Sequence, residues 1–106
     1  SPPPHDTPLA VCDLRSVDAG DVRLGEFIED YGEHGVYRAP LRLLRHAPGQ
    51  AWWSFRDMVP DELLLFLGHD SAGRDGCFHA AFHDPLCPPN VRGRASVETR
   101  TFAFFA

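Results

Sequence analysis

The chain has 106 residues, a length that fits one domain with a single modest core. Ten Lys and Arg against fifteen Asp and Glu give a formal net charge of −5, and the basic residues are scattered singly among acidic ones. This distribution argues against a nucleic-acid-binding surface, where clustered positive charge supplies most of the affinity.

Two further absences narrow the class of protein. The longest uninterrupted apolar run, Leu63 to Leu67, is far shorter than the roughly 20 residues that a membrane-spanning helix needs. The three cysteines are irregularly spaced, and no signal-peptide-like apolar stretch stands at the N-terminus. The sequence therefore predicts a cytoplasmic protein that does not enter a membrane.

The N-terminal third combines a proline-rich start with mixed signals. Residues 1–8, SPPPHDTP, are predicted to be an extended arm or linker that does not pack, and residues 9–106 the domain itself. Leu9 to Cys12 reads as a short strand. Ser16, followed by Asp18 and Asp21, is predicted to start one short helix that runs towards Tyr31.

The rest of the chain favours strands and turns, because ten prolines and nine glycines divide it into short segments. Strands are expected at 35–46 and 50–58, joined as a hairpin at 47–49, and at 77–82. The run at 63–67 favours a strand covered on both faces, with a buried helical turn as the alternative. From residue 94 to residue 105 the side chains alternate as on a strand. The predicted class is mainly β.

Chemistry-bearing residues gather in one segment, which reads FHAAFHDPLCPPNVRGRASVETR from residue 78 to residue 100. Arg94 carries a planar fork of donors that fits a carboxylate, and Ser96 follows on the same strand face about 6.5–7 Å away. Both side chains could reach one carboxylate. Two plainer interpretations stay open: a surface Arg94 paired with Glu98, or Arg100 as the partner of Glu98. Arg100 could instead be a second anion contact.

His79 in the same segment is either a metal ligand or an ordinary strand histidine. A rival zinc site would use Cys77, His79, His83 and Cys87, but Cys-x-His followed by His-x3-Cys matches no familiar zinc spacing. Trp52 and Trp53 face opposite ways on their strand, so one of the two can point into a pocket.

Five blocks of the sequence, in order, resemble the family of fungal and bacterial hydroxylase/desaturases typified by AsaB, CmcJ and NvfI. The first four blocks contain, in turn, a Leu-Cys-Asp segment, two tryptophans, an Asp-Ser turn and His79. The fifth block is the Arg-x-Ser segment. The chain departs from the family at Phe78 and Ala80 beside the histidine, and at Ala95, where glutamate is usual. The blocks are residues 8–17, 52–62, 69–71, 78–85 and 94–100.

This resemblance implies a non-haem Fe(II), 2-oxoglutarate-dependent oxygenase of secondary metabolism that acts on a small-molecule substrate. The fold implied is a jelly-roll or cupin-like double-stranded β-helix, of which this chain supplies the C-terminal portion. His79 would then bind iron, while Arg94 and Ser96 would hold the far carboxylate of 2-oxoglutarate. The family's remaining metal ligands, His-x-Asp, have no counterpart in this sequence.

Three sources for those ligands stay open: an upstream segment, a second chain, or a residue such as Asp13 or His34. The alternative class of function is a non-catalytic half-barrel that binds another molecule, or a truncated oxygenase remnant. A half-barrel exposes sheet edges and an apolar face, so a homodimer or a partner chain that completes the barrel is expected.

Overall fold

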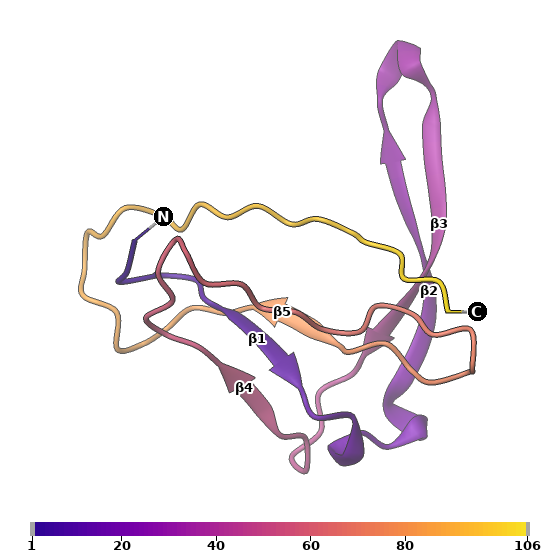
Figure 1. Ribbon diagram of the computed structural model, residues 1–106, viewed down its shortest axis with the longest axis horizontal. Coiled ribbons are helices and arrows are strands. Elements are labelled where there is room, and N and C mark those ends of the chain that lie inside the picture. The colour runs from indigo at the N-terminus through magenta and orange to yellow at the C-terminus, as the bar shows by residue number, and fades with distance from the viewer. Residues whose placement is uncertain (1, 106) are drawn as a thin grey trace.

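The computed structural model describes residues 2–105, and it is mainly β, as the sequence predicts. A three-stranded sheet and a two-stranded hairpin, both antiparallel, make up the regular structure (Figure 1). Within the described residues the helical elements are three single 3-10 turns, Leu14–Ser16, Ala19–Asp21 and Gly32–His34. The strands are β1 (Leu9–Cys12), β2 (Val22–Asp30), β3 (Val36–Leu44), β4 (Trp52–Ser54) and β5 (His79–Ala81).

The three-stranded sheet has the order β4-β1-β5, with β1 in the middle. Its central strand alternates, so that Ala10 and Cys12 are buried on one face while Leu9 and Val11 are half-buried on the other. This alternation is what a strand with one covered face requires. The core of the protein therefore lies against one face of β1.

The N-terminal arm packs against this sheet, so the prediction that it stays unpacked is wrong. His5 and Pro8 are buried, and the His5 Nε2–H donates to the carbonyl of Met58 at 2.9 Å. The amides of Phe82 and Asp84 donate to the carbonyls of Pro8 and Asp6, which continues the β1–β5 ladder beyond the strands. These backbone hydrogen bonds hold the arm despite its prolines.

The β2–β3 hairpin pairs Val22 with Leu44 at its base and Asp30 with Val36 at its tip. Gly32 and Gly35 in the turn have φ angles of +62° and +94°, which side chains with a Cβ rarely adopt. Figure 1 shows that the hairpin projects away from the three-stranded sheet.

Four predicted elements are wrong. The helix expected from Ser16 towards Tyr31 is replaced by the two 3-10 turns and β2. Asp13 and Asp18 do cap, since each accepts a backbone N–H two residues on, but each capped turn ends after three residues. The following segment, VRLGEFIED, then pairs with β3 along its whole length, because strand pairing satisfies every other backbone group of β2.

The hairpin predicted between residues 35–46 and 50–58 is also wrong. Both segments do contain strands, β3 and β4, but β3 pairs with β2 and β4 pairs with β1. Residues 63–67 and 94–105 carry no strand, because neither segment forms a ladder within the described chain. Residues 77–82 are a strand only at His79–Ala81.

Among the helical elements of residues 2–105, none has the length and apolar character needed to cross a bilayer.

Candidate functional site

His79 lies on the less buried face of the three-stranded sheet. It is paired with Val11 of β1, and Val11 is paired on its other side with Trp53 of β4. Directly opposed residues of an antiparallel sheet share a face, so His79 and Trp53 flank Val11 on the same face. The ring of Phe66 lies 4.7 Å from the His79 ring, centroid to centroid. Of the two tryptophans, Trp53 is the one that shares the histidine's face.

The tautomer of His79 is fixed by its local contact. The His79 Nδ1 lies 3.1 Å from the carbonyl oxygen of Cys77, and because a carbonyl only accepts, Nδ1 carries the proton. Nε2 is left as the ring's lone-pair donor when the imidazole is neutral. This is the arrangement in which metal-binding histidines are usually oriented.

Arg94 is anchored to the N-terminal arm. Its backbone N–H donates to Asp6 Oδ1 at 3.0 Å, and its Nε–H donates to the carbonyl of Thr7 at 2.6 Å. The guanidinium is thereby oriented by a carbonyl 87 residues away in the sequence, and the backbone of Arg94 is held by a carboxylate 88 residues away.

Ser96 meets the same guanidinium, as the shared-face argument predicts. Arg94 Nη1 donates to Ser96 Oγ at 2.5 Å. No hydrogen bond engages Nη2 within residues 2–105, so this nitrogen of the guanidinium remains available to an anion. Glu98 pairs with Arg100 at 3.8 Å rather than with Arg94, so the surface-pair interpretation of Arg94 is wrong and that of Arg100 is confirmed.

Acidic side chains surround the anchor of Arg94. The Arg94 backbone N–H holds the pKa of the Asp6 carboxyl below its ordinary 3.8. Nearby, Asp84 accepts from Arg56 Nε at 2.6 Å and from Nη2 at 3.1 Å, and this pairing lowers the pKa of the Asp84 carboxyl. Both carboxyls are therefore negative at neutral pH, and each already accepts a hydrogen bond from an arginine.

The ladder sets the spacing between the two parts of the site. Thr7, which anchors Arg94, and Val11, which faces His79, are four positions apart along the arm and β1, at most about 13 Å. A dicarboxylate and two long side chains can span a gap of this size.

The residues present do not make an iron site by themselves. Residues 2–105 contain no group of three or more His, Cys, Asp or Glu side chains placed to hold a metal ion. Asp13 is taken by Arg15, which lowers the pKa of its carboxyl to about 2, and His34 lies at the tip of the hairpin. His79 is thus a single candidate ligand, and the rival zinc cluster is not assembled either.

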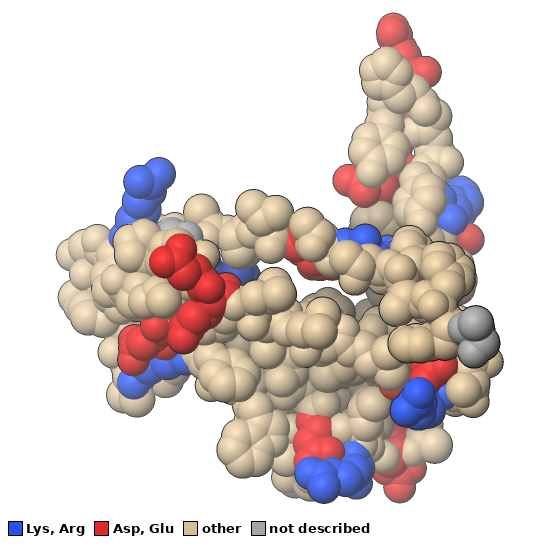
Figure 2. All heavy atoms as spheres, viewed as in Figure 1, with Lys and Arg blue, Asp and Glu red and all other residues tan. Residues whose placement is uncertain are grey.

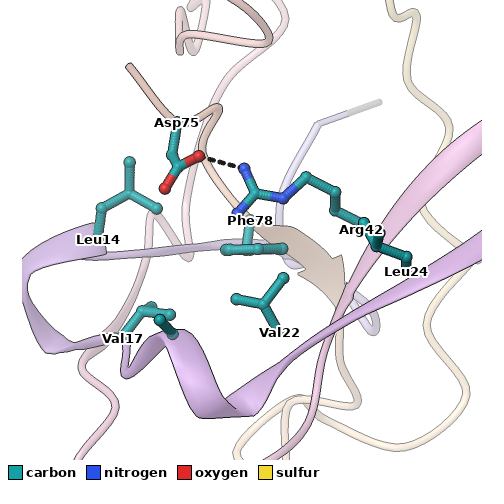
Figure 3. Close-up of a pocket in the computed structure, with 8 residues that line it drawn as sticks. Leu14, Val17, Val22, Leu24, Arg42, Asp75 and Phe78 are labelled. Carbon is teal, nitrogen blue, oxygen red and sulfur yellow. Dashed lines mark hydrogen bonds and ion pairs between the residues drawn. The ribbon is translucent and has the colours of Figure 1, made fainter. Parts of the chain in front are cut away.

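Sequence reasoning missed a pocket on the other side of the sheet (Figure 3). The cavity measures about 320 Å³ and lies between the base of the hairpin and the segment before β5. Arg42 stands over the Phe78 ring, 5.5 Å from its centroid, and pairs with Asp75. Phe78 precedes His79 and so points to the opposite face of the strand. The pocket is lined by Leu14, Val17, Ala19, Val22, Leu24, Arg42, Asp75 and Phe78.

Sequence reasoning also missed Asp6 and Thr7 as the partners of Arg94. No local pattern links positions so far apart, because their contact follows from the ladder between the arm and residues 82–84. The proline content of the arm favoured an extended segment that does not pack against the domain.

Comparison with known proteins shows what the chain is similar to. A family model described as an oxidoreductase/YMDC permease-like domain matches residues 2–104. The hydroxylase/desaturase efuI of Hormonema carpetanum is 33% identical over 92% of this chain and 36% of its own length. The hydroxylase/desaturase asaB of Aspergillus flavus is 34% identical over 98% of this chain and 51% of its own length.

A third relative, the gibberellin cluster GA4 desaturase of Gibberella fujikuroi, is 29% identical over 92% of this chain and 30% of its own length. The chain thus spans between about a third and half of the curated relatives that it matches. No solved structure gives a significant match. The resemblance read from the sequence blocks is confirmed, and the chain belongs to the oxidoreductase/YMDC permease-like domain family, with the fungal hydroxylase/desaturases among its relatives.

Proposed function

We propose that this chain is the co-substrate-binding part of a hydroxylase/desaturase, in which Arg94 and Ser96 hold a carboxylate of 2-oxoglutarate. The observation that carries the proposal is the hydrogen bond of 2.5 Å between Arg94 Nη1 and Ser96 Oγ. It places a guanidinium edge and a hydroxyl side by side, with Thr7 and Asp6 fixing the orientation of the arginine. The unengaged Nη2 of Arg94 and the Ser96 hydroxyl, which accepts from Nη1 and still has its own proton to donate, together offer two donors to a carboxylate.

His79 is proposed as one ligand of the Fe(II) that such a reaction uses, and Trp53 as part of the wall that faces a small secondary metabolite. When bound, the iron and 2-oxoglutarate supply the oxidising chemistry. Arg94 and Ser96 orient the carboxylate, and His79 presents its imidazole. The remaining iron ligands are supplied by residues other than these three. The proposed fold of the whole enzyme is a jelly roll, and its proposed location is the cytoplasm.

Binding of 2-oxoglutarate to the chain, measured by calorimetry in the absence of iron, tests this assignment. A charge-assisted hydrogen bond contributes about 1.5–3 kcal/mol, so Arg94→Ala is expected to weaken binding by about ten- to one-hundred-fold. Ser96→Ala is expected to weaken it less, because it removes a neutral partner.

The matched control is Arg100→Ala, which removes an exposed arginine from the same segment, where it is paired with Glu98. Equal loss of binding in Arg94→Ala and Arg100→Ala would show attraction by general positive charge and would contradict a specific carboxylate site. Loss of folding in Arg94→Ala is checked by circular dichroism, with Arg94→Lys as a variant that keeps the charge but not the fork.

A second candidate function is a non-catalytic binding module, and the missing metal cluster favours it. It predicts that 2-oxoglutarate binds neither the chain nor Arg94→Ala measurably. The two functions are therefore separated by the same titration.

A further inference from the structure

The chain exposes far more surface than a compact protein of its size. A folded monomer of 11.8 kDa is expected to expose about 5,900 Å², whereas this chain exposes 8912 Å². Its radius of gyration is 16.2 Å against about 13 Å for a compact chain of this length. The chain therefore exposes about 3,000 Å² more surface than a compact monomer of its mass.

The hairpin contributes to this exposed surface, and it stands clear of the rest of the molecule in Figure 2. Residues that are paired in the hairpin share a face, and one face is apolar except for Arg23 near its base and Glu29 near its tip. Phe27 and Tyr37 meet edge to face there, with ring centroids 6.4 Å apart, and both are about half exposed. We call this surface the apolar hairpin face: Gly25, Phe27, Tyr37, Ala39, Leu41 and Leu43.

The hairpin also has one open edge and one blocked edge. Tyr31 donates to Gly35 and Arg45 donates to Asp21 at its two ends, so the hydrogen-bonded pairs fall at odd-numbered positions of β2. Pro40, which is opposite Glu26, is then at a non-bonded position with its nitrogen on the outer edge of β3. That edge lacks a donor in its middle, whereas the outer edge of β2 presents Leu24, Glu26 and Ile28, whose outward backbone groups have no backbone partner within residues 2–105.

A second copy of the chain is too small an occupant for this surface. A standard interface buries about 800 Å² per partner, which leaves more than half of the excess uncovered. The C-terminal segment also leaves apolar surface uncovered, since Phe104 and Phe105 are 92% and 93% exposed. The area fits a polypeptide that folds together with this chain better than one that docks on a finished surface.

We propose that the open edge of β2 and the apolar hairpin face are covered by the part of a hydroxylase/desaturase polypeptide that this chain does not span, with one strand of it added along β2. Relatives carry such additional polypeptide, because the chain covers 36% of efuI and 51% of asaB. Strand addition satisfies the unpaired groups of β2, and the added sheet covers the face that contains Phe27. The inference rests on exposed surface and does not depend on the proposed reaction.

The test pairs this chain with the part of Aspergillus flavus asaB that lies outside the matched stretch, each with its own affinity tag. Co-purification and hydrogen exchange of the amides of residues 22–30 are measured, and asaB divided at the same point serves as the reference pair. We expect a one-to-one complex in which the β2 amides exchange at least tenfold more slowly than in the chain alone.

Glu26→Pro sharpens the test, because the Glu26 N–H points outward as the Pro40 nitrogen does on the other strand. The hairpin ladder keeps all its bonds in this variant, but the edge loses its central donor. We expect association to fall at least tenfold, while Glu26→Thr, which keeps the donor, associates as the unmodified chain does.

Two results would overturn the proposal. One is a chain that forms no complex with the asaB part, whether or not the reference pair associates. The other is a concentration-dependent dimer of the chain alone, seen by sedimentation, that protects the β2 amides as strongly as the mixture does. Because the readouts are association and exchange, failure of 2-oxoglutarate binding leaves this result untouched.

Discussion

The three-stranded sheet and the β2–β3 hairpin are both antiparallel, yet their neighbours hold them in different ways. The sheet is tied to the arm, to the loop after β4 and to residues 82–94 by contacts between distant parts of the chain. The hairpin is held by its own ladder and a base contact between Arg42 and Asp75. Burial of Ala10 and Cys12 belongs to the first region, whereas the second exposes both faces.

This difference separates the region that positions the candidate site from the region that is available to a partner. The region with distant contacts fixes Arg94 and His79 relative to one strand, which a binding site needs. The hairpin, whose distant contact is confined to its base, presents an open edge and an apolar face. A two-stranded hairpin on its own is only marginally stable in water. The predictions below use substitutions that act on one region and spare the other.

The largest effect is expected from a charge placed in the sheet core. Cys12 is 3% exposed, so Cys12→Asp buries an unpaired carboxylate and is expected to cost about 3–5 kcal/mol of unfolding free energy. Leu24→Asp in the hairpin, where the side chain is 85% exposed, is expected to stay within about 0.5 kcal/mol. Urea unfolding followed by circular dichroism measures both. Equal losses would mean that the hairpin is as buried as the sheet.

Acidification is expected to loosen the sheet region before the hairpin. The pKa values of the Asp6 and Asp84 carboxyls are lowered from 3.8, the first mainly by the Arg94 N–H and the second mainly by Arg56. A lowered pKa in the folded state gives stability that is present above pH 3.8 and is lost as pH falls through the folded-state values.

The variant Asp84→Asn should therefore lower the urea midpoint at neutral pH and flatten its fall between about pH 5 and pH 2. Asp61→Asn, which changes an exposed carboxylate, is the matched control. If both variants keep the acid dependence of the unmodified chain, the Arg56–Asp84 pair does not contribute to it.

A smaller and local effect is expected at the hairpin turn. Gly35 has a φ of +94°, a conformation that alanine adopts only with strain of about 1–3 kcal/mol. Gly35→Ala should speed hydrogen exchange of the β2 and β3 amides and leave those of β1 and β5 unchanged. Gly49→Ala is the comparison, since that glycine has open space around it and an ordinary backbone. Faster exchange throughout the chain would show that the two regions unfold together.

The smallest effect on stability is expected at the blocked edge. Pro40→Val restores an outward N–H to β3 without adding a bond to β2, so the unfolding free energy should change by less than about 0.5 kcal/mol. Self-association should increase, because the second edge becomes open, and light scattering measures it. A large change in stability would mean that the proline nitrogen faces β2 instead.

Sequence patterns predicted the strand character of the chain better than its pairing. The segments that contain β1, β3, β4 and β5 were all predicted as strands, because β-branched and aromatic residues stand between turn formers there. The helix predicted from Ser16, with Asp18 and Asp21, towards Tyr31 covers the segment that forms β2. Asp18 does cap, but it caps only a 3-10 turn, and Phe27 and Ile28 then suit a strand paired with β3.

The site divides in the same way. The pairing of Arg94 with Ser96 and of Arg100 with Glu98 could be predicted, because alternation along an extended segment places them together. The partners Thr7 and Asp6 could not, since they approach Arg94 only through the ladder that joins the arm to residues 82–84.

By itself, the sequence determined a mainly β chain, the family to which it belongs, and the local order of His79, Arg94 and Ser96. These depend on residue types and spacings within short segments, where backbone geometry leaves few choices. Only the tertiary structure decided that β2 pairs with β3, that the proline-rich arm anchors Arg94, and that one edge and one face of the hairpin stay open. Those outcomes depend on which distant backbone groups satisfy one another, because each buried N–H and C=O needs a partner that no local pattern names.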